Sequence, residues 1–198
     1  MKDAVIASSK ASMPITVRPT QQDIAIARVI SRNTTPPTER AASILTWAAD
    51  EHVVCALALG WWLWCRSKPE PRRLASDHLL VTALAASLVP HLLKRVFNQK
   101  RPDRLTVLGH LHGVPISGKA EDSFPSGHAI QVGAISSAAS QLPGGERRIV
   151  RALGACLIST RVLLLAHWTS DVVVGSAIGV VLERLIRCVT GYGRRDQV

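Results

Sequence analysis

Three ionisable residues interrupt one of the most apolar stretches of the sequence, STRVLLLAHWTSDVVVG. They are Arg161, His167 and Asp171. Each is costly to bury without a partner, so the three are expected to contact one another or a ligand. A carboxylate that accepts one N–H of an imidazole fixes its tautomer and leaves the other ring nitrogen free to act as a nucleophile. The pattern therefore predicts a histidine nucleophile, His167, that is oriented by Asp171 and accompanied by a cation.

The spacing of these residues requires a break in the helix that carries them. At about 100° per residue, Arg161 and His167 would point roughly 120° apart on a straight helix. The helix must therefore end or bend before His167 if both side chains face one pocket. The segment HWTSD can supply this break, with Thr169 or Ser170 as an N-cap and Asp171 in the first turn of the next helix.

A second cluster, KRVFNQKRP, carries cations that suit a phosphate ester. Lys94 and Arg101 can neutralise phosphoryl oxygens together with Arg161, and the guanidinium groups can make bidentate contacts.

A third cluster, FPSGHA, opens an apolar segment, so its residues are expected at a helix N-terminus. There, Ser126, Gly127 and His128 would lie where free backbone N–H groups and the helix dipole favour an anion. Gly127 lacks a Cβ that would obstruct close approach, and His128 is placed to donate a proton.

Each cluster alone also has an ordinary structural explanation. Pro-Ser-Gly is common turn chemistry, and Lys94 with Arg101 could simply complement the dipole of their own helix. Arg161 could form a structural ion pair with Asp171. The chemical interpretation therefore depends on whether the three clusters meet in space.

Five apolar segments provide elements that could bring the clusters together. They are rich in Ala and Leu, too long for ordinary strands, and separated by breakers such as KPEPRR and LPGGERR, which predicts helices. In an up-and-down bundle the end of the second, the start of the third, the end of the fourth and the start of the fifth lie at one face. We therefore expect an all-α, membrane-embedded bundle of about five helices with the active site at one face; a soluble all-α bundle is the alternative. The segments are 44–65, 76–97, 127–142, 149–166 and 170–189.

Small residues within the third and fifth segments predict close helix packing. Gly175 and Gly179 are four residues apart, as are Gly133 and Ser137, and such pairs let two helix backbones approach.

The chain is expected to form one helical domain, 43–191, with a basic tail at 192–198. Residues 1–42 are mostly polar and contain four prolines, which favours a loose arm with one short amphipathic piece, DIAIARVI.

The formal charge of +10 suggests an anionic partner. Nucleic acid is disfavoured, because the Lys and Arg residues form short clusters between apolar runs and only one Tyr and two Phe are available for base stacking. The four cysteines are widely spaced and predict neither a disulfide framework nor a zinc site.

The three clusters resemble the motifs of the phosphatidic acid phosphatase type 2 superfamily, which also includes bacterial acid phosphatases and vanadium haloperoxidases. The family motifs are K-x6-RP, PSGH and SR-x5-H-x3-D. This chain has KRVFNQKRP, PSGH and TRVLLLAHWTSD, with all internal spacings matched. Thr160 stands in place of the usual Ser; it keeps the hydroxyl and adds a methyl group that the pocket must accommodate.

The resemblance implies a role for each motif residue. His167 would form a phosphohistidine, Asp171 would orient it, and His128 would protonate the leaving group and then activate water. It implies no metal and no cofactor for phosphatase activity. The residues that would bind the phosphate are Lys94, Arg101, Arg161, Ser126, Gly127 and Thr160.

The predicted function is hydrolysis of a phosphomonoester or pyrophosphate of a lipid, such as a phosphatidate or a polyprenyl pyrophosphate, by a protein embedded among membrane lipids. Two alternatives stay open: a vanadate-dependent peroxidase that uses the same pocket, and a non-catalytic membrane protein that retains it. The loop 103–123 lies at the mouth of the proposed pocket. There His110, His112 and Lys119 could contact a head group or could simply be solvated.

Two short loops on the face opposite the predicted site are rich in cations. The positive-inside rule assigns such loops to the cytoplasm. The expected location is therefore a bacterial inner membrane with the active site on the extracytoplasmic side. The cations are Arg66, Lys68, Arg72 and Arg73 in one loop and Arg147, Arg148 and Arg151 in and after the other.

Overall fold

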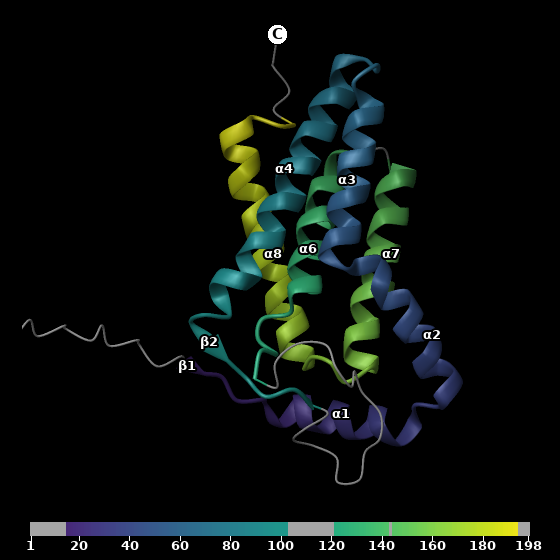
Figure 1. The fold of residues 1–198 in the computed structure, drawn as a ribbon, viewed down its shortest axis with the longest axis vertical. Coiled ribbons are helices and arrows are strands. Elements are labelled where there is room, and N and C mark those ends of the chain that lie inside the picture. Colours follow the sequence, from purple (N-terminus) through teal and green to yellow (C-terminus); the bar gives the residue numbers. More distant parts are fainter. Residues whose placement is uncertain (1–14, 103–120, 143, 194–198) are drawn as a thin grey trace, which may run out of the picture.

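The computed structural model describes residues 15–102, 121–142 and 144–193, and within these ranges the chain is mostly helical (Figure 1). Two short 3₁₀ turns, Trp47–Ala49 and Ala139–Gln141, follow α2 and α6. A two-residue parallel pairing joins β1 (Ile15–Thr16) to β2 (Phe97–Asn98). The described α-helices are α1 Gln21–Asn33, α2 Pro36–Thr46, α3 Glu51–Cys65, α4 Glu70–Leu93, α6 Gly127–Ala138, α7 Gly144–Leu163 and α8 Thr169–Thr190.

The expected number of about five helices is too low, because the described residues contain seven. The two additional helices, α1 and α2, come largely from the segment that was expected to be a loose arm. Thr20 begins α1 with a capping box, since its hydroxyl accepts the N–H of Asp23 at 3.1 Å while the Asp23 carboxylate accepts the N–H of Thr20 at 2.9 Å. Pro36 and Pro37 occupy the first turn of α2, where a missing N–H costs little.

The other five helices correspond to the five apolar segments and pack around α6. This short helix contacts α3, α4, α7 and α8, and its residues 129–134 are all buried. Its polar Gln131 is accommodated because the side-chain amide donates to the carbonyl oxygen of Ala83 in α4 at 3.2 Å. Burial on several sides explains why α6 has little amphipathic pattern.

The closest helix pair is α6 and α8, and glycine permits it, as predicted. A Cβ at Gly175 would lie 2.7 Å from the carbonyl oxygen of Ser126, and one at Gly179 would overlap the carbonyl oxygen of Ile130. Gly133 of α6 likewise lies against the backbone of Ser176 in α8. The start of α8 is thereby held directly against the start of α6.

A buried polar cluster holds the opposite end of the bundle. Glu183 of α8 is fully buried, and its carboxylate accepts hydrogen bonds from Arg187 at 2.6 Å and from Ser137 of α6 at 2.6 Å. The imidazole Nε2 of His78 in α4 lies 2.9 Å from the same carboxylate. These contacts tie three helices together around one charge that would be costly to bury unpartnered.

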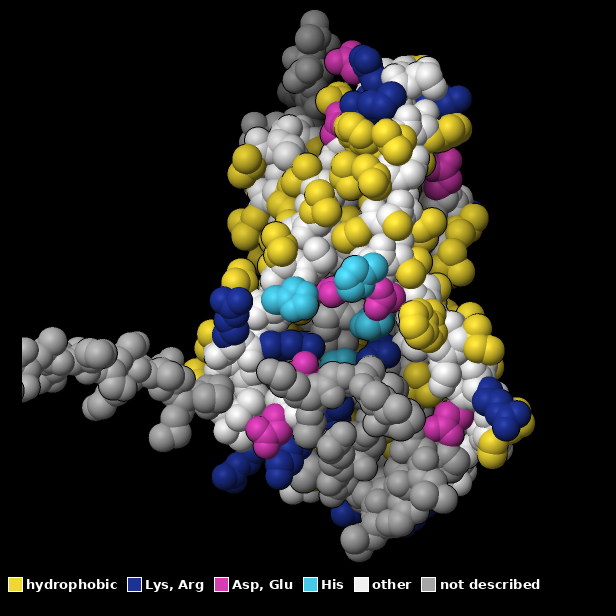
Figure 2. Space-filling model, viewed as in Figure 1, with side chains coloured by type: hydrophobic (Ala, Val, Ile, Leu, Met, Phe, Trp, Pro, Cys, Tyr) yellow, Lys and Arg dark blue, Asp and Glu magenta, His cyan; other side chains and the backbone are white. Residues whose placement is uncertain are grey.

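Large apolar side chains cover the outside of the helices, as Figure 2 shows over the upper part of the molecule. Leu57, Leu88, Leu153 and Val181, from four different helices, are each more than half exposed. By length and hydropathy, one described helix, α4, could cross a membrane, and α2 with α3 would count as a second span bent by 46°. The histidine side chains gather lower down in Figure 2, with charged side chains beside and below them, and another group of charged side chains lies at the top.

Candidate active site

The helix ends that carry the three clusters meet at one end of the bundle, as the up-and-down arrangement predicts (Figure 1). Lys94 is the C-cap of α4, and Ser126 is the N-cap of α6. Arg161 lies in the last turn of α7, and Asp171 in the first turn of α8. His167 lies in the turn between α7 and α8.

The predicted break before His167 is present, because α7 ends at Leu163. Leu165 adopts a left-handed conformation with φ of 52°, and the N–H groups of Ala166 and His167 return to the carbonyl oxygen of Arg161 at 3.0 and 3.2 Å. This is the usual way for a helix to satisfy its last carbonyls. A leucine is strained there, but Leu165 is 2% exposed and packs with Ala27 of α1.

The start of α8 differs by one or two residues from the prediction. The N-cap is Trp168 rather than Thr169 or Ser170. The carboxylate of Asp171 accepts the backbone N–H of Trp168 at 2.9 Å, which satisfies the amide at the helix start. The indole of Trp168 donates to the carbonyl oxygen of Lys100 at 2.8 Å and so joins the turn to the loop that carries Arg101.

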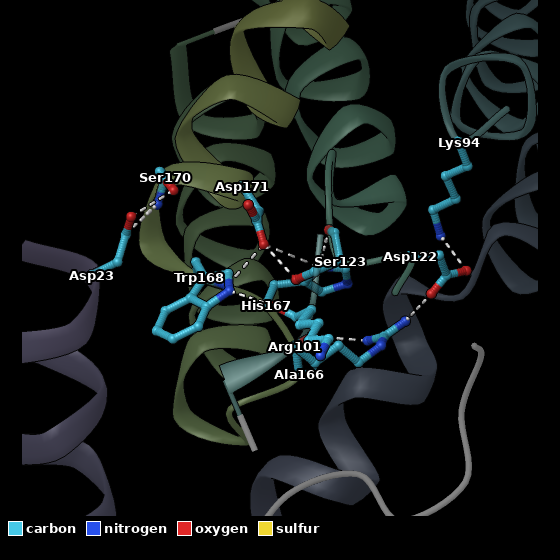
Figure 3. A network of polar contacts seen from close by, with 11 residues as sticks. Asp23, Lys94, Arg101, Asp122, Ser123, Ala166, His167, Trp168, Ser170 and Asp171 are labelled. Carbon is cyan, nitrogen blue, oxygen red and sulfur yellow. Dashed lines mark hydrogen bonds and ion pairs between the residues drawn. The ribbon is translucent and has the colours of Figure 1, made fainter. Parts of the chain in front are cut away.

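His167 is oriented by a backbone carbonyl, which corrects the expected direct bond to Asp171. Its Nδ1 lies 2.7 Å from the carbonyl oxygen of Ser123 but 3.8 Å from Oδ2 of Asp171 (Figure 3). The Asp171 Oδ2 atom instead accepts the hydroxyl of Ser123 at 2.6 Å. Because a carbonyl can only accept, Nδ1 must carry the proton, and Nε2 of the neutral ring keeps its lone pair.

The surroundings keep the His167 ring neutral. The side chain is 3% exposed, and burial lowers the pKa of His167 well below its usual value, with Arg161 and Arg101 lowering it further. A neutral imidazole is the form that can attack phosphorus.

Two of the predicted cations share one carboxylate. Arg101 donates to Oδ1 of Asp122 at 2.9 Å, and Lys94 donates to Oδ2 of Asp122 at 3.3 Å. Arg101 also donates to the carbonyl oxygen of Ala166 at 2.8 Å, directly before His167. Figure 3 shows this chain of contacts running from Lys94 through Asp122 and Arg101 to the His167 turn.

The third cation, Arg161, is 5% exposed and approaches from α7. One of its terminal nitrogens donates to the hydroxyl of Thr46 in α2 at 3.0 Å. Its Nε atom is buried and has no hydrogen-bond partner among the described residues, so it is available to an anion.

The PSGH segment also lies at this end. Ser126 is fully buried, and its hydroxyl has no partner among the described residues. A Cβ at Gly127 would lie 3.3 Å from the ring of Pro90, so packing against α4 is one reason for glycine there. The charges of Arg161 and Asp50 are close enough to act on the His128 ring.

Thr160 does not offer a free hydroxyl proton. Its hydroxyl donates to the carbonyl oxygen of Leu157 in its own helix at 2.6 Å, and the residue is 5% exposed. The loop residues His110, His112 and Lys119 lie outside the described residues.

Three residues of the site are not among those that the sequence patterns predict. Asp122 and Ser123 immediately precede FPSGH, and their proximity to that motif was the only signal in the sequence. Asp23 belongs to the arm, yet its carboxylate accepts the N–H and the hydroxyl of Ser170 at 2.9 and 2.8 Å (Figure 3). The helix α1 therefore holds the first turn of α8 in place.

Replacing Asp122 by asparagine is expected to strengthen inhibition by vanadate. The amide keeps the shape of the side chain but removes the negative charge next to Lys94 and Arg101, so an oxyanion meets less repulsion. We expect the Ki for vanadate to fall roughly fivefold, the effect of about 1 kcal/mol from one charge in a partly solvated pocket. The matched control is Asp77→Asn, which removes a carboxylate paired with Arg66 at the other end of the bundle. An unchanged or higher Ki in Asp122→Asn would contradict this interpretation.

Comparison with known proteins decides the family. A profile of the PAP2 superfamily matches residues 77–195, which include all three motifs. The chain belongs to the PAP2 superfamily. The resemblance inferred from KRVFNQKRP, PSGH and TRVLLLAHWTSD is thereby confirmed.

Curated relatives match over part of their length. A lipid A 1-phosphatase of Rhizobium etli is 39% identical over 103 residues, which are 52% of this chain and 44% of the relative. A decaprenylphosphoryl-5-phosphoribose phosphatase of Mycobacterium tuberculosis is 29% identical over 113 residues, which are 57% of this chain and 60% of the relative. The chain thus spans about half the length of the curated relatives it matches.

Two solved structures share the fold. The crystal structure of Aquifex aeolicus LpxE superposes with a TM-score of 0.71 at 18% identity, covering 87% of this chain and 98% of that one. A transmembrane PAP2 type phosphatidylglycerolphosphate phosphatase from Bacillus subtilis gives a TM-score of 0.61 at 19% identity, covering 89% and 88%. At these identities the similarity establishes the architecture alone.

Proposed function

We propose that this chain is a lipid phosphate phosphatase that hydrolyses a phosphomonoester or pyrophosphate through a phosphohistidine at His167. The observation that carries the proposal is the Nδ1 contact with the Ser123 carbonyl at 2.7 Å, because it leaves Nε2 as the free nucleophile among three cations. The matched relatives from Rhizobium and Mycobacterium are named as phosphatases of lipid A and of a decaprenyl-linked phosphate, which supports a lipid phosphate as the substrate class.

The proposed reaction has two displacements at phosphorus. In the first, Nε2 of His167 attacks, the bond from phosphorus to the leaving oxygen breaks, and His128 gives that oxygen its proton. In the second, His128 takes a proton from water, the water oxygen attacks phosphorus, and the N–P bond breaks to release phosphate. The cations Lys94, Arg101 and Arg161 stabilise the charge on the transferred group.

The remaining motif residues have supporting roles in this proposal. Ser126 offers its hydroxyl to the phosphate, and Gly127 contributes to the N–H groups at the start of α6 that the phosphate can contact. Thr160 lines the same phosphate site from α7. Asp171 acts as a positioning residue, because it holds Ser123 and the Trp168 amide rather than the His167 ring itself.

Activity is expected to survive EDTA. Three cationic side chains and a helix N-terminus supply the charge stabilisation that a bound metal supplies in other phosphatases. Phosphate release from purified protein, before and after chelation, checks this expectation. Loss of activity with EDTA and recovery with magnesium or zinc would contradict it. Oxidation of halide by added hydrogen peroxide in the presence of vanadate would instead favour the peroxidase alternative.

We further propose that the helices α3, α4, α6, α7 and α8 are embedded in the bacterial inner membrane with the site facing away from the cytoplasm. The loop between α3 and α4 and the start of α7, which carry the two groups of cations, lie at the end opposite the site (Figure 1). In this proposal residues 43–191 form the catalytic domain, α1 before them holds the first turn of α8 through Asp23, and 192–198 are a basic tail.

Cysteine labelling tests the orientation. In a protein whose native cysteines are replaced by alanine, a cysteine at position 35, between α1 and α2, is expected to react with a membrane-impermeant reagent in intact cells. A cysteine at position 67, between α3 and α4, is expected to react only after lysis. The reverse result would place the site in the cytoplasm.

A further inference from the structure

An apolar cavity lies beside the site, between α3 and α7 and against α6. Its volume is about 320 Å³, and its lining is almost entirely apolar. Leu57 of α3 and Leu153 of α7 line it and are 67% and 59% exposed, so it opens on the outer surface between these two helices. None of the three sequence motifs contributes to it.

One end of this cavity adjoins the candidate active site on three helices. Val54 follows Asp50, the N-cap of α3, by four residues, and Leu157 precedes Arg161 by four residues. Gln131 follows Gly127 by four residues. Four residues are one helical turn, or about 6 Å along the axis, so Leu157 and Gln131 each lie one turn deeper than a residue of the candidate phosphate site, and Val54 lies one turn deeper than Asp50, whose charge acts on His128.

The other end of the cavity is closed at Trp61. Seven residues separate Val54 from Trp61, so the cavity extends about 10 Å along α3. A smaller cavity of about 60 Å³ lies beyond, and Trp61 lines both. Leu79, Ile135 and Val150 also line both and complete the wall between them.

We propose that this cavity holds a hydrocarbon chain of the substrate whose phosphate occupies the site, and that Trp61 limits the length of chain that fits. This rests on the proposed phosphatase function. The opening toward the outer surface lets the rest of the lipid remain in the bilayer, while the first part of the chain is buried one turn below the phosphate. The occupant is apolar because the lining offers little polar surface, with Gln131 already donating to Ala83.

The test uses a series of monoalkyl phosphates of increasing chain length with purified protein in detergent. For each protein variant, kcat/KM on the series is divided by kcat/KM on p-nitrophenyl phosphate, which has no alkyl chain. This ratio cancels differences in the amount of folded enzyme. In the wild type it is expected to rise about fourfold per methylene until the chain reaches Trp61, and then to level off.

Two variants should move this profile in opposite directions. Trp61→Ala joins the two cavities, so the ratio should continue to rise over longer chains. Ala58→Phe fills the cavity from α3, so the ratio should level off at a shorter chain. Trp64→Ala is the matched control, because Trp64 lies on the same helix, is 51% exposed and lines neither cavity.

The outcomes separate the cavity from the chemistry. If the wild type cleaves the alkyl phosphates but Trp61→Ala and Ala58→Phe keep the wild-type profile, the substrate chain does not bind in this cavity and the proposal is wrong. Should Ala58→Phe fail to fold, Leu157→Phe blocks the same space from α7 and replaces it. If no phosphate is released from any substrate by the wild type, the proposed function itself fails.

Discussion

Replacement of His167 by alanine is expected to abolish phosphate release from every substrate, by roughly 10⁴- to 10⁶-fold, the range seen when an enzyme loses its nucleophile. Among the described residues, no other histidine has its Nδ1 bonded to a backbone carbonyl near Lys94, Arg101 and Arg161. Without Nε2 of His167 there is no atom to form the covalent intermediate, so a better leaving group cannot compensate. The loss should therefore be the same for alkyl phosphates and for p-nitrophenyl phosphate.

The measurement is kcat/KM on both substrates, with the melting temperature of each variant as a check on folding. His91→Ala is a suitable control, since His91 has a side chain that is 62% exposed and pairs only with Glu51 among the described contacts. Activity of His167→Ala on p-nitrophenyl phosphate above about a hundredth of wild type would exclude His167 as the nucleophile.

Replacement of His128 by alanine is expected to produce a different failure. Its proposed task is proton transfer, which is typically worth roughly 10²- to 10⁴-fold. The loss in kcat/KM should be of that size for an alkyl phosphate, because its leaving alkoxide needs a proton. The loss in kcat/KM should shrink to about tenfold or less for p-nitrophenyl phosphate, whose leaving phenolate is stable without a proton. The quantity is kcat/KM because it reports the first displacement and not the later step in which His128 activates water.

The informative quantity is the ratio of the two losses. In His128→Ala the alkyl phosphate should suffer at least about ten times more than the aryl phosphate, whereas in His167→Ala the ratio should be near one. Equal losses on both substrates in His128→Ala would assign His128 to phosphate binding instead of acid catalysis.

The break between α7 and α8 and the close approach of α6 to α8 could be predicted because they depend on local sequence. The end of α7 before His167 followed from the direction in which Arg161 and His167 would point on a continuous helix. The close approach of α6 and α8 followed from Gly175 and Gly179. Both are properties of residues that lie close together in the sequence.

The partners within the site could not be predicted in the same way. The acceptor for His167 is the main-chain carbonyl of Ser123, and every residue has such a carbonyl, so no residue type identifies it. The pattern of His167 and Asp171 four residues apart suggested a direct bond, but the N-cap of α8 takes the Asp171 carboxylate. Competition between capping and side-chain pairing is decided by the geometry of the turn.

In the arm, residues 1–42, local features could likewise be predicted but distant contacts could not. Thr20 and Asp23 form a capping box, which is a local signal for a helix start. The second role of Asp23, accepting two hydrogen bonds from Ser170, depends on α1 packing across the start of α8, far away in the sequence. Polar composition and four prolines made this segment resemble a loose arm, although two of the prolines simply begin α2.

The central claim is that phosphorus becomes bonded to His167, and trapping the intermediate tests it most directly. Purified protein is mixed with a substrate radiolabelled in the phosphate, quenched with base within the first turnover, and digested for peptide mapping. The account predicts an acid-labile, base-stable label on the peptide that contains His167, and no label in His167→Ala. A label on the peptide that contains Ser126 or Thr160 would contradict it.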